Sequence, residues 1–245
     1  MKNIFKKKDK INRDYESFNE AYRLLRTNIQ YSFTGDKDSK VILITSAEQG
    51  DGKSTTSFNL ANKLSDLEKK VLLIDIDIRK PSQHKNFNIS NIFGLTDILV
   101  GECEIEKVKH IISENLSVIT TGKRVPTASE LISSREFKYM INKLREDYDY
   151  IIIDSAPINV VSDAMGILED IDGVLLVARY RKTKKRSVYS VCKKINQANG
   201  KIIGVVFNGV ELNSNSYYYY YYQNNYYQGH KGKRTRRQGK RSGRH

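Results

Sequence analysis

Six short apolar runs recur along the middle of this chain, and they constrain the fold more than any other feature. Each is five or six residues long, and most are apolar and β-branched at consecutive positions, as in strands covered on both faces. Helical stretches separate them, so the pattern predicts a doubly wound, mainly parallel α/β sheet with helices on both faces. The predicted strands are Val41–Thr45, Val71–Asp75, Leu116–Thr120, Tyr150–Asp154, Gly173–Ala178 and Ile202–Phe207. The predicted helices between them include Ser54–Lys69, Ser129–Asp147 (with Thr127 and Glu130 as a capping box), Val161–Glu169 and Lys185–Ala198.

The two ends of the chain differ in composition from this middle part. Residues 1–13 are basic and we expect them to be flexible, whereas the apolar spacing of one helix face begins after Asp14. Residues 14–212 are expected to form one globular domain, since 39% of the chain is hydrophobic. Residues 213–245 are low in complexity, and from Gly229 they hold eight Lys or Arg and no acid, out of a net charge of +14. Such a basic end is either solvated or bound to nucleic acid, anionic lipid or an acidic partner.

The sequence argues against a cysteine metal site, a secreted protein and a membrane-spanning protein. Cys103 and Cys192 have no metal-ligand spacing and fit the reducing cytoplasm. The N-terminal sequence MKNIFKKKDKI has no apolar core of a signal peptide. No run approaches the roughly 18 apolar residues of a membrane span. We therefore expect a cytoplasmic protein, which another protein must hold if it works at a membrane.

Half of the 16 tyrosines lie in one eleven-residue stretch near the C-terminus. No helix or strand can bury such a run on one face, because strand neighbours alternate and helix neighbours fan around the axis. The stretch is therefore predicted to be a displayed substrate whose tyrosines are phosphorylated. These are Tyr217, Tyr218, Tyr219, Tyr220, Tyr221, Tyr222, Tyr226 and Tyr227.

The sequence VILITSAEQGDGKSTT reads as a strand, a glycine-bearing loop and a helix start, which is the context of a phosphate loop. Backbone N–H groups of such a loop bind phosphate oxygens, and the helix dipole favours the anion. Ala47 replaces the first glycine of the strict pattern. Asn208, after the last strand, is expected either to contact adenine or to cap the turn at Gly209. The predicted nucleotide-binding residues are Gly50, Asp51, Gly52, Lys53, Ser54, Thr55 and Asn208.

Three aspartates follow two of the predicted strands. Asp75 and Asp77 lie in VLLIDIDIRKP, and Asp154 ends YIIID. Each alone could be a strand-end cap. Because ligands bind at the carboxyl ends of parallel strands, we expect all three beside the phosphate loop. They predict a catalytic set of Lys53, Asp75, Asp77 and Asp154, and a Mg²⁺ set of Ser54, Asp75 and Asp154.

These motifs follow one another in a fixed order. The phosphate loop comes first, then Asp75-x-Asp77-x-Arg79-Lys80-Pro81, then Ile-Ile-Ile-Asp154-Ser155-x-Pro157 and the tyrosine cluster. Glu20-x-x-Arg23-x-x-Arg26 precedes them, and Gly94-Leu95-Thr96-Asp97-Ile98-Leu99 lies between the aspartate motifs. From Tyr15 to Tyr227 the chain resembles the bacterial tyrosine kinases of capsule and exopolysaccharide synthesis, the CpsD/CapB type of Gram-positive bacteria. The basic end after Gly229 is not part of the resemblance.

The resemblance implies an ATP- and Mg²⁺-dependent protein-tyrosine kinase with a P-loop NTPase-like fold. It implies that the kinase phosphorylates its tyrosine cluster in trans and regulates polymerisation and export of a capsular polysaccharide or exopolysaccharide. Asp77 is expected to accept the phenolic proton, with Asp75 as second candidate.

The resemblance also implies partners. Copies are expected to form a ring through Glu20, Arg23 and Arg26, which from spacing alone merely share one helix face. A membrane-embedded regulator of chain length is expected to activate the kinase at the inner face of the membrane, and other proteins of the cell are possible substrates.

Two other classes of protein share parts of this pattern. ATPases of the partition and division-site type have the same aspartates, but they carry an early second lysine in the loop, where this chain has Glu48. A nucleic-acid-binding protein would use the basic end beside stacking aromatics. That interpretation gives no role to Asp75, Asp77 and Asp154, so we expect no nucleic acid partner.

Overall fold

The computed structural model describes residues 2–33, 39–125, 128–159 and 163–210 of the chain. Residues 21–210 belong to one compact unit that contains the whole sheet. Residues 2–20 belong to a second unit and form the first part of helix α1 (Lys2–Ser32). Helix α1 thus begins before Asp14, because a lysine-rich segment has good helix propensity even without an apolar face. The domain boundaries at 14 and 212 and the flexibility of residues 1–13 stay predictions, and the tyrosine cluster lies outside the described residues.

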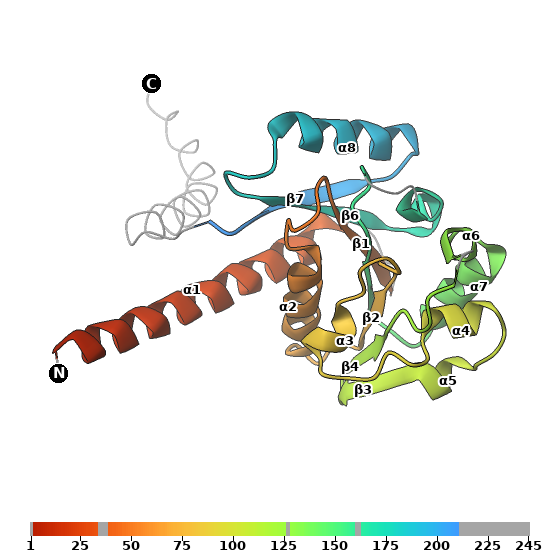
Figure 1. Cartoon of the computed structure of the whole chain (residues 1–245), viewed down its shortest axis with the longest axis horizontal. Coiled ribbons are helices and arrows are strands. Elements are labelled where there is room, and N and C mark those ends of the chain that lie inside the picture. Colours follow the sequence, from red (N-terminus) through yellow and green to blue (C-terminus); the bar gives the residue numbers. More distant parts are fainter. Residues whose placement is uncertain (1, 34–38, 126–127, 160–162, 211–245) are drawn as a thin grey trace, which may run out of the picture. The chain divides into compact units, whose positions relative to one another are not determined.

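A seven-stranded sheet forms the centre of residues 21–210 (Figure 1). The strand order is β3-β4-β2-β5-β1-β6-β7, and all neighbours are parallel except β3 and β4. The strands are β1 Lys40–Ser46, β2 Val71–Asp75, β3 Lys109–Ser113, β4 Leu116–Ile119, β5 Tyr150–Asp154, β6 Gly173–Arg179 and β7 Ile202–Asn208. All but β3 coincide with predicted strands, so the expected doubly wound, mainly parallel sheet is confirmed.

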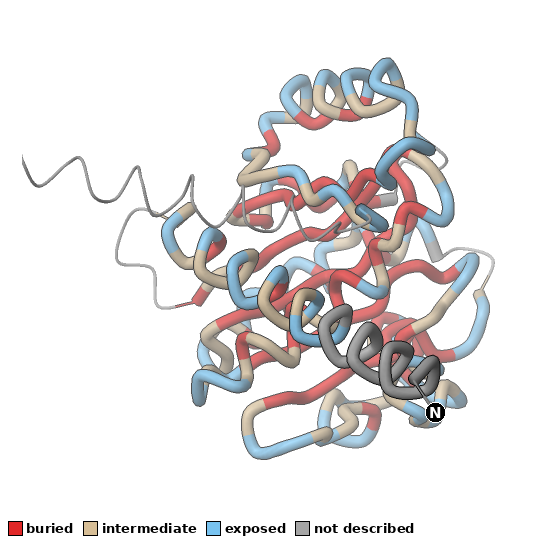
Figure 2. The backbone as a smooth tube through the Cα atoms, turned by 90° about the vertical axis from the view of Figure 1, so that its left-hand side faces the viewer, coloured by how far each residue is buried: buried red, intermediate tan, exposed pale blue. Residues whose placement is uncertain are grey.

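Helices cover both faces of the sheet, and the central strands are buried along their length (Figure 2). Besides α1, the helices are α2 Lys53–Ser65, α3 Gln83–Asn86, α4 Leu95–Leu99, α5 Ile105–Val108, α6 Ala128–Ile132, α7 Arg135–Leu144 and α8 Lys185–Gln197. Neighbouring strand residues alternate between two cores, because side chains point to opposite faces. In β1, Ile42 belongs to the core that includes Ile29 of α1 and Leu60 of α2. Leu43 belongs to the core that includes Phe137 of α7.

Three segments differ from the sequence-based expectation. The apolar pattern does not predict β3, since this antiparallel edge strand is half-exposed. The helix expected over Ser129–Asp147 is two helices, because the Ser134 hydroxyl accepts a hydrogen bond from the Phe137 N–H and begins α7. The helix expected over Val161–Glu169 is wrong, since its described residues form short 3₁₀ turns at Asp163–Met165 and Leu168–Asp170. Thr127, expected as a cap, lies outside the described residues.

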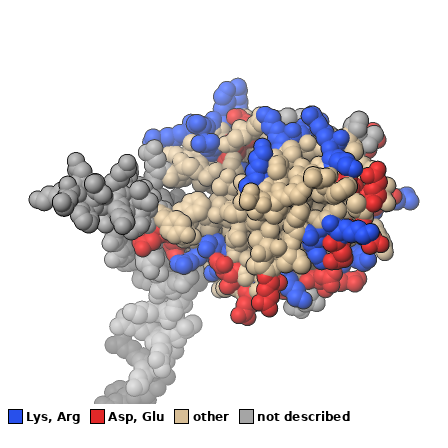
Figure 3. Space-filling view, turned by 60° about the horizontal axis from the view of Figure 1, so that its bottom comes forward, with Lys and Arg blue, Asp and Glu red and all other residues tan. Residues whose placement is uncertain are grey.

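Charge is unevenly distributed over this domain. The stretch from Arg179 to Val210 forms the end of β6, α8 and β7, and it holds nine Lys or Arg and no acid. On the face drawn in Figure 3, Lys and Arg dominate the upper part, whereas most Asp and Glu lie lower down. The domain therefore has a basic region of its own in addition to residues 229–245.

Candidate active site

The loop between β1 and α2 has the backbone that a phosphate loop requires. Gly50 and Gly52 have φ angles of 81° and 97°, in the left-handed region that favours glycine. Helix α2 begins directly afterwards, at Lys53, so the N–H groups of its first turn are available to an anion. Lys53 itself is only 6% exposed. The predicted loop residues therefore form a compact anion-binding turn at the carboxyl end of β1.

Side chains from the β6 and β7 side of the sheet hold this loop. Thr183 Oγ1 donates to Asp51 Oδ1 at 2.6 Å, and Arg179 Nη1 donates to the Gly50 carbonyl oxygen at 3.1 Å. Asn208 Nδ2 donates to the Asp51 carbonyl oxygen at 3.1 Å. The loop is thus fixed by groups far away in sequence.

Asn208 lies directly against the phosphate loop. A Cβ atom added at Gly52 would come within 1.7 Å of Asn208 Nδ2, so these two residues are packed together. The side chain therefore joins the end of β7 to the loop. Its expected contact with adenine stays a prediction.

Asp75 and Asp154 occupy paired positions at the ends of β2 and β5. Both are completely buried. Asp75 Oδ1 accepts from the Asp77 N–H at 3.0 Å, while Oδ2 accepts from the N–H groups of Ser82 and Gln83 at 3.0 and 2.9 Å. Both oxygens of Asp75 are therefore occupied by backbone donors.

Gln83 connects three parts of the site. Its Nε2 donates to Asp154 Oδ2 at 2.7 Å and to the Ser54 carbonyl oxygen at 3.0 Å, and its backbone N–H donates to Asp75. Ser57 Oγ donates to the other oxygen of Asp154 at 3.2 Å. Gln83 is completely buried, so it acts as a fixed link between the first turn of α2 and both carboxylates.

Burial sets the acid–base properties of the two paired aspartates. Burial and, second, the charge of Asp154 raise the pKa of Asp75 to about 8, against the opposing effect of three backbone N–H groups. Burial also raises the pKa of Asp154 to about 6, against the opposing effects of Ser54, Gln83 and Lys53. Two adjacent buried acids are unfavourable when both are ionised, and a nearby cation relieves this. Carboxylate and hydroxyl oxygens are suitable Mg²⁺ ligands, so the residues present fit such an ion.

Asp77 lies just beyond the end of β2 and keeps 7% of its surface exposed. Its Oδ1 accepts from the Lys80 N–H at 3.0 Å. Asp77 therefore differs from Asp75, which has no exposed surface. The sequence-predicted aspartates and phosphate loop meet at one edge of the sheet, while their individual roles stay predictions.

The predicted interface residues lie on α1, far from the paired carboxylates in the sequence. Arg26 Nη1 donates to the Lys63 carbonyl oxygen of α2 at 3.1 Å, and its Nε is buried without a hydrogen-bond partner among the described residues. Arg23 is exposed, and Glu20 belongs to the separately described unit. Their role between copies stays a prediction.

Gln83, Arg179 and Thr183 were not predicted from the sequence. Arg179 follows a predicted strand, so the strand-end argument that found the aspartates could have found it. Thr183 and Gln83 lie in a connecting segment and a four-residue helix, where no spacing marks them.

Comparison with known proteins decides the family. A family model described as an AAA domain matches residues 39–203, from β1 into β7. Tyrosine-protein kinase CpsD of Streptococcus pneumoniae is 38% identical over 200 residues, which are 81% of this chain and 87% of CpsD. The putative tyrosine-protein kinase CapB of Staphylococcus aureus is 36% identical over 201 residues, 82% of this chain and 88% of CapB. This chain belongs to the CpsD/CapB family of bacterial tyrosine-protein kinases. The resemblance inferred from its motifs is confirmed.

Solved structures agree with the CpsD/CapB assignment. The crystal structure of the chimerical protein CapA2B2 has a TM-score of 0.73 and 34% identity, and the match covers 78% of this chain and 84% of that one. The septum site-determining protein MinD of Pyrococcus horikoshii, at 23% identity and a TM-score of 0.60, shows a shared fold only. The expected P-loop NTPase-like fold is therefore confirmed.

Proposed function

We propose that this CpsD/CapB-type chain is an ATP- and Mg²⁺-dependent protein-tyrosine kinase that phosphorylates the tyrosine cluster of another copy. The observation that carries the proposal is the meeting of the phosphate loop with Asp75, Asp77 and Asp154 at the carboxyl edge of one sheet. The names of relatives at 36% and 38% identity support the tyrosine specificity. The acceptors would be the eight tyrosines between Tyr217 and Tyr227.

The residues at this edge would bind the nucleotide and neutralise its charge. The N–H groups of Gly50 to Thr55 would bind the phosphates, and Lys53 would offset the charge of the terminal ones. Ser54, Asp154 and Asp75 would hold Mg²⁺. When bound, Mg²⁺ supplies positive charge at the β- and γ-phosphate oxygens.

Asp77 is proposed to accept the proton of the tyrosine hydroxyl as the γ-phosphoryl group passes from ATP to that oxygen and leaves ADP. Asp75 is the second candidate, but both of its oxygens already accept N–H hydrogen bonds, whereas Asp77 retains exposed surface. The ordinary pKa values are about 4 for aspartate and about 10 for tyrosine, so Asp77 would take the proton late, in a loose transition state.

A membrane protein and other copies are the proposed partners. Similarity to CapB and to the chimerical protein CapA2B2 supports a membrane-embedded activator that regulates polysaccharide chain length. Within the parts of the chain that the structure describes, no helix is both long and apolar enough to cross a membrane. The partner would hold the kinase at the inner face of the membrane, where it would regulate polysaccharide polymerisation and export.

Glu20, Arg23 and Arg26 are proposed to contribute contacts between copies in a ring. The hydrogen bond from Arg26 to the Lys63 carbonyl oxygen ties residues 21–32 of α1 to α2, which supports a fixed presentation of Arg23 and Arg26.

The alternative function is that of a partition or division-site type ATPase. One observation favours the kinase. Glu48 occupies the loop position where those ATPases carry their second lysine, and its Oε1 accepts from Ser187 Oγ of α8 at 2.8 Å. The position therefore ties the loop to α8 instead of presenting a cation to a phosphate.

The deciding experiment measures phosphotyrosine formation in the full chain with ATP and Mg²⁺, with and without a peptide of the partner's cytoplasmic tail. We expect phosphate on the cluster, lost in Lys53→Met and kept in Lys63→Met. Lys63 is the matched control because it lies on the same helix and pairs with Asp66. ATP hydrolysis without any phosphotyrosine, even with the peptide, would instead indicate the ATPase.

A further inference from the structure

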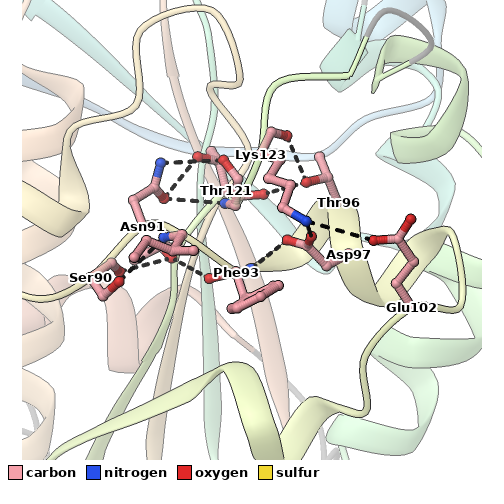
Figure 4. A network of polar contacts seen from close by, with 12 residues as sticks. Ser90, Asn91, Phe93, Thr96, Asp97, Glu102, Thr121 and Lys123 are labelled. Atoms are coloured by element: carbon pink, nitrogen blue, oxygen red, sulfur yellow. Dashed lines mark hydrogen bonds and ion pairs between the residues drawn. The ribbon is translucent and has the colours of Figure 1, made fainter.

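Two segments at the carboxyl end of β4 form one surface, which we call the Phe93 platform. They are residues 91–94, which precede α4, and residues 121–124, which follow β4. Figure 4 shows the polar contacts that join them. Asn91 Oδ1 accepts from Thr121 Oγ1 and from the Gly122 N–H, both at 3.1 Å.

Two glycines and two buried polar side chains make this platform rigid. A Cβ atom at Gly94 would lie 2.3 Å from the Gly122 backbone nitrogen, so the two backbones touch. Asp97 Oδ2 accepts from the Gly94 N–H at 2.8 Å. Thr96 Oγ1 donates to the Lys123 carbonyl oxygen at 2.8 Å. Neither segment can shift without breaking buried hydrogen bonds, and a buried donor left unpaired costs roughly 1–3 kcal/mol.

The sheet register places the platform beside the proposed catalytic aspartates. Ile119 of β4 pairs with Ile74 of β2, so the residues after Ile119 lie next to Asp75 and the chain that follows it. Asn208 ends β7 at the opposite edge of the sheet, with β2, β5, β1 and β6 between β4 and β7. The platform and Asn208 therefore flank the aspartates from opposite sides.

The platform exposes aromatic and apolar surface on this rigid backbone. Ile92 is 65% and Phe93 is 48% exposed, although both adjoin a buried network. Lys123 Nζ lies 4.8 Å from the centre of the Phe93 ring, and it also lies within 4 Å of Asp97 and Glu102 carboxylate oxygens. The platform holds a second exposed cation, Arg124, so its two cations are balanced by these two carboxylates. Such a surface suits an uncharged aromatic segment better than an anion, because aromatic rings pair with each other at about 0.5–1.5 kcal/mol beyond area burial.

We propose that the Phe93 platform docks the tyrosine-rich segment, residues 217–227, of a second copy of this chain. The inference rests on the proposed kinase function, for which it supplies the acceptor site. Residues 213–228 contain no charged side chain, which matches the locally neutral platform. Strand β7, which precedes this segment in the same chain, is separated from β4 by β2, β5, β1 and β6, which favours a segment supplied by another copy. A second copy can approach Asp77 directly from the β4 side.

The test separates docking from catalysis. The acceptor is the full chain carrying Lys53→Met, which keeps its tyrosines. The enzyme is the full chain with the eight cluster tyrosines changed to serine, with or without Phe93→Ala.

We expect Phe93→Ala to lower kcat/KM for the acceptor about tenfold, mainly through KM, while its KM for ATP changes less than twofold. Phe93→Trp should restore transfer because it restores an aromatic ring. Tyr139→Ala is the matched control, since Tyr139 is 72% exposed on α7 and is not part of the platform.

Binding is measured in parallel by fluorescence anisotropy, with a labelled synthetic peptide of residues 213–228. We expect about tenfold weaker binding to the Phe93→Ala enzyme than to its parent. Unchanged peptide binding and unchanged acceptor KM in that variant would overturn the docking site. Weaker binding without phosphate transfer in any variant would leave the docking site standing and overturn the kinase proposal.

Discussion

One neutral side chain, Gln83, links the phosphate-loop helix to both buried carboxylates. Its amide nitrogen lies 2.7 Å from Asp154 Oδ2 and 3.0 Å from the Ser54 carbonyl oxygen. Its own carbonyl oxygen accepts from Asn86 Nδ2 at 3.0 Å, which fixes the orientation of the amide. Gln83 therefore holds Asp154 in one position relative to Ser54, the two residues proposed to share Mg²⁺.

We expect Gln83→Leu to lower kcat about tenfold to a hundredfold and to raise the Mg²⁺ concentration for half-maximal activity. The substitution keeps the volume but leaves a buried carboxylate oxygen without its donor, which costs roughly 1–3 kcal/mol. The measurement is the rate of phosphotyrosine formation at increasing Mg²⁺ concentrations. The control is His84→Leu, because the buried Nδ1 of this neighbouring residue has no hydrogen-bond partner in the described structure. Equal Mg²⁺ dependence in Gln83→Leu and the parent would contradict the positioning role.

At this scale the sequence predicted the phosphate loop and the aspartates and missed the side chains that support them. Asp75, Asp77 and Asp154 could be found because a carboxylate after an apolar strand is conspicuous and strand ends share an edge. Gln83 and Thr183 act through hydrogen bonds whose partners are defined only by the fold. No spacing of residues in the sequence predicts such contacts.

At the scale of elements, the ends of β2 and β5 bring two buried acids together, and this costs stability. The pKa of such a carboxyl group is higher in the folded state than in the unfolded state, so ionisation favours the unfolded state. The free energy of unfolding therefore falls as pH rises from the unfolded-state pKa to the folded-state pKa. For Asp154 this window runs from 3.8 to about 6.

Asp154→Asn removes this ionisation, but it also replaces one acceptor oxygen facing Ser57 or Gln83 with a donor, which costs roughly 1–3 kcal/mol at any pH. Relative to the parent and without nucleotide or Mg²⁺, its stability should therefore rise by on the order of 2 kcal/mol from low pH to pH 8. This relative gain should vanish below about pH 3, where the carboxyl group is protonated in both states. Urea unfolding at both pH values is the measurement, with the exposed Asp66→Asn as control. A stability difference between Asp154→Asn and the parent that is the same at both pH values would contradict the argument.

The segment between β6 and α8 supports the phosphate loop from the side. We expect Thr183→Val to weaken nucleotide binding about tenfold, because Asp51 loses a 2.6 Å hydrogen bond and a bond to a charged group contributes roughly 1.5–3 kcal/mol. Titration with a fluorescent ATP analogue measures this. Thr27→Val should have no effect, since that hydroxyl donates to the Arg23 carbonyl oxygen within α1. An unchanged affinity in Thr183→Val would show that the loop keeps its shape without this support.

The elements predicted well are those that are buried on both faces. Central strands such as β5 consist of consecutive apolar residues, and this pattern survives in the sequence because both faces meet a core. Strand β3 has neither continuous apolar residues nor alternation, since it is a half-exposed edge. The helix over Ser129–Asp147 was split by a local hydrogen bond at Ser134, which period alone cannot reveal.

For the whole molecule, charge connects phosphorylation to assembly. Residues 217–245 hold eight Lys or Arg and no acid, and each phosphotyrosine adds about −1.5 to −2. Full phosphorylation of the cluster would add roughly −12 to −16 and make this end clearly negative. The negatively charged clusters would then lie at each contact between copies and repel each other.

We expect a fully phosphorylated preparation to dissociate to a smaller species than the unmodified chain. Light scattering at matched concentration and low salt measures the mass, and a variant with the eight cluster tyrosines changed to phenylalanine is the control. Equal masses with and without phosphate would contradict the proposed charge effect.

The contact between Gly94 and Gly122 also bears on how this family can diverge. Any side chain at either position would collide with backbone atoms of the other segment, at 2.3 Å for Gly94 and 2.6 Å for Gly122, so the backbone itself would have to move. We expect both positions to remain glycine. Ile92 and Phe93 are exposed, so they can be replaced without loss of the fold. A fixed backbone with replaceable exposed side chains would let relatives differ in the acceptors they prefer. The residues that carry out phosphoryl transfer would not have to change.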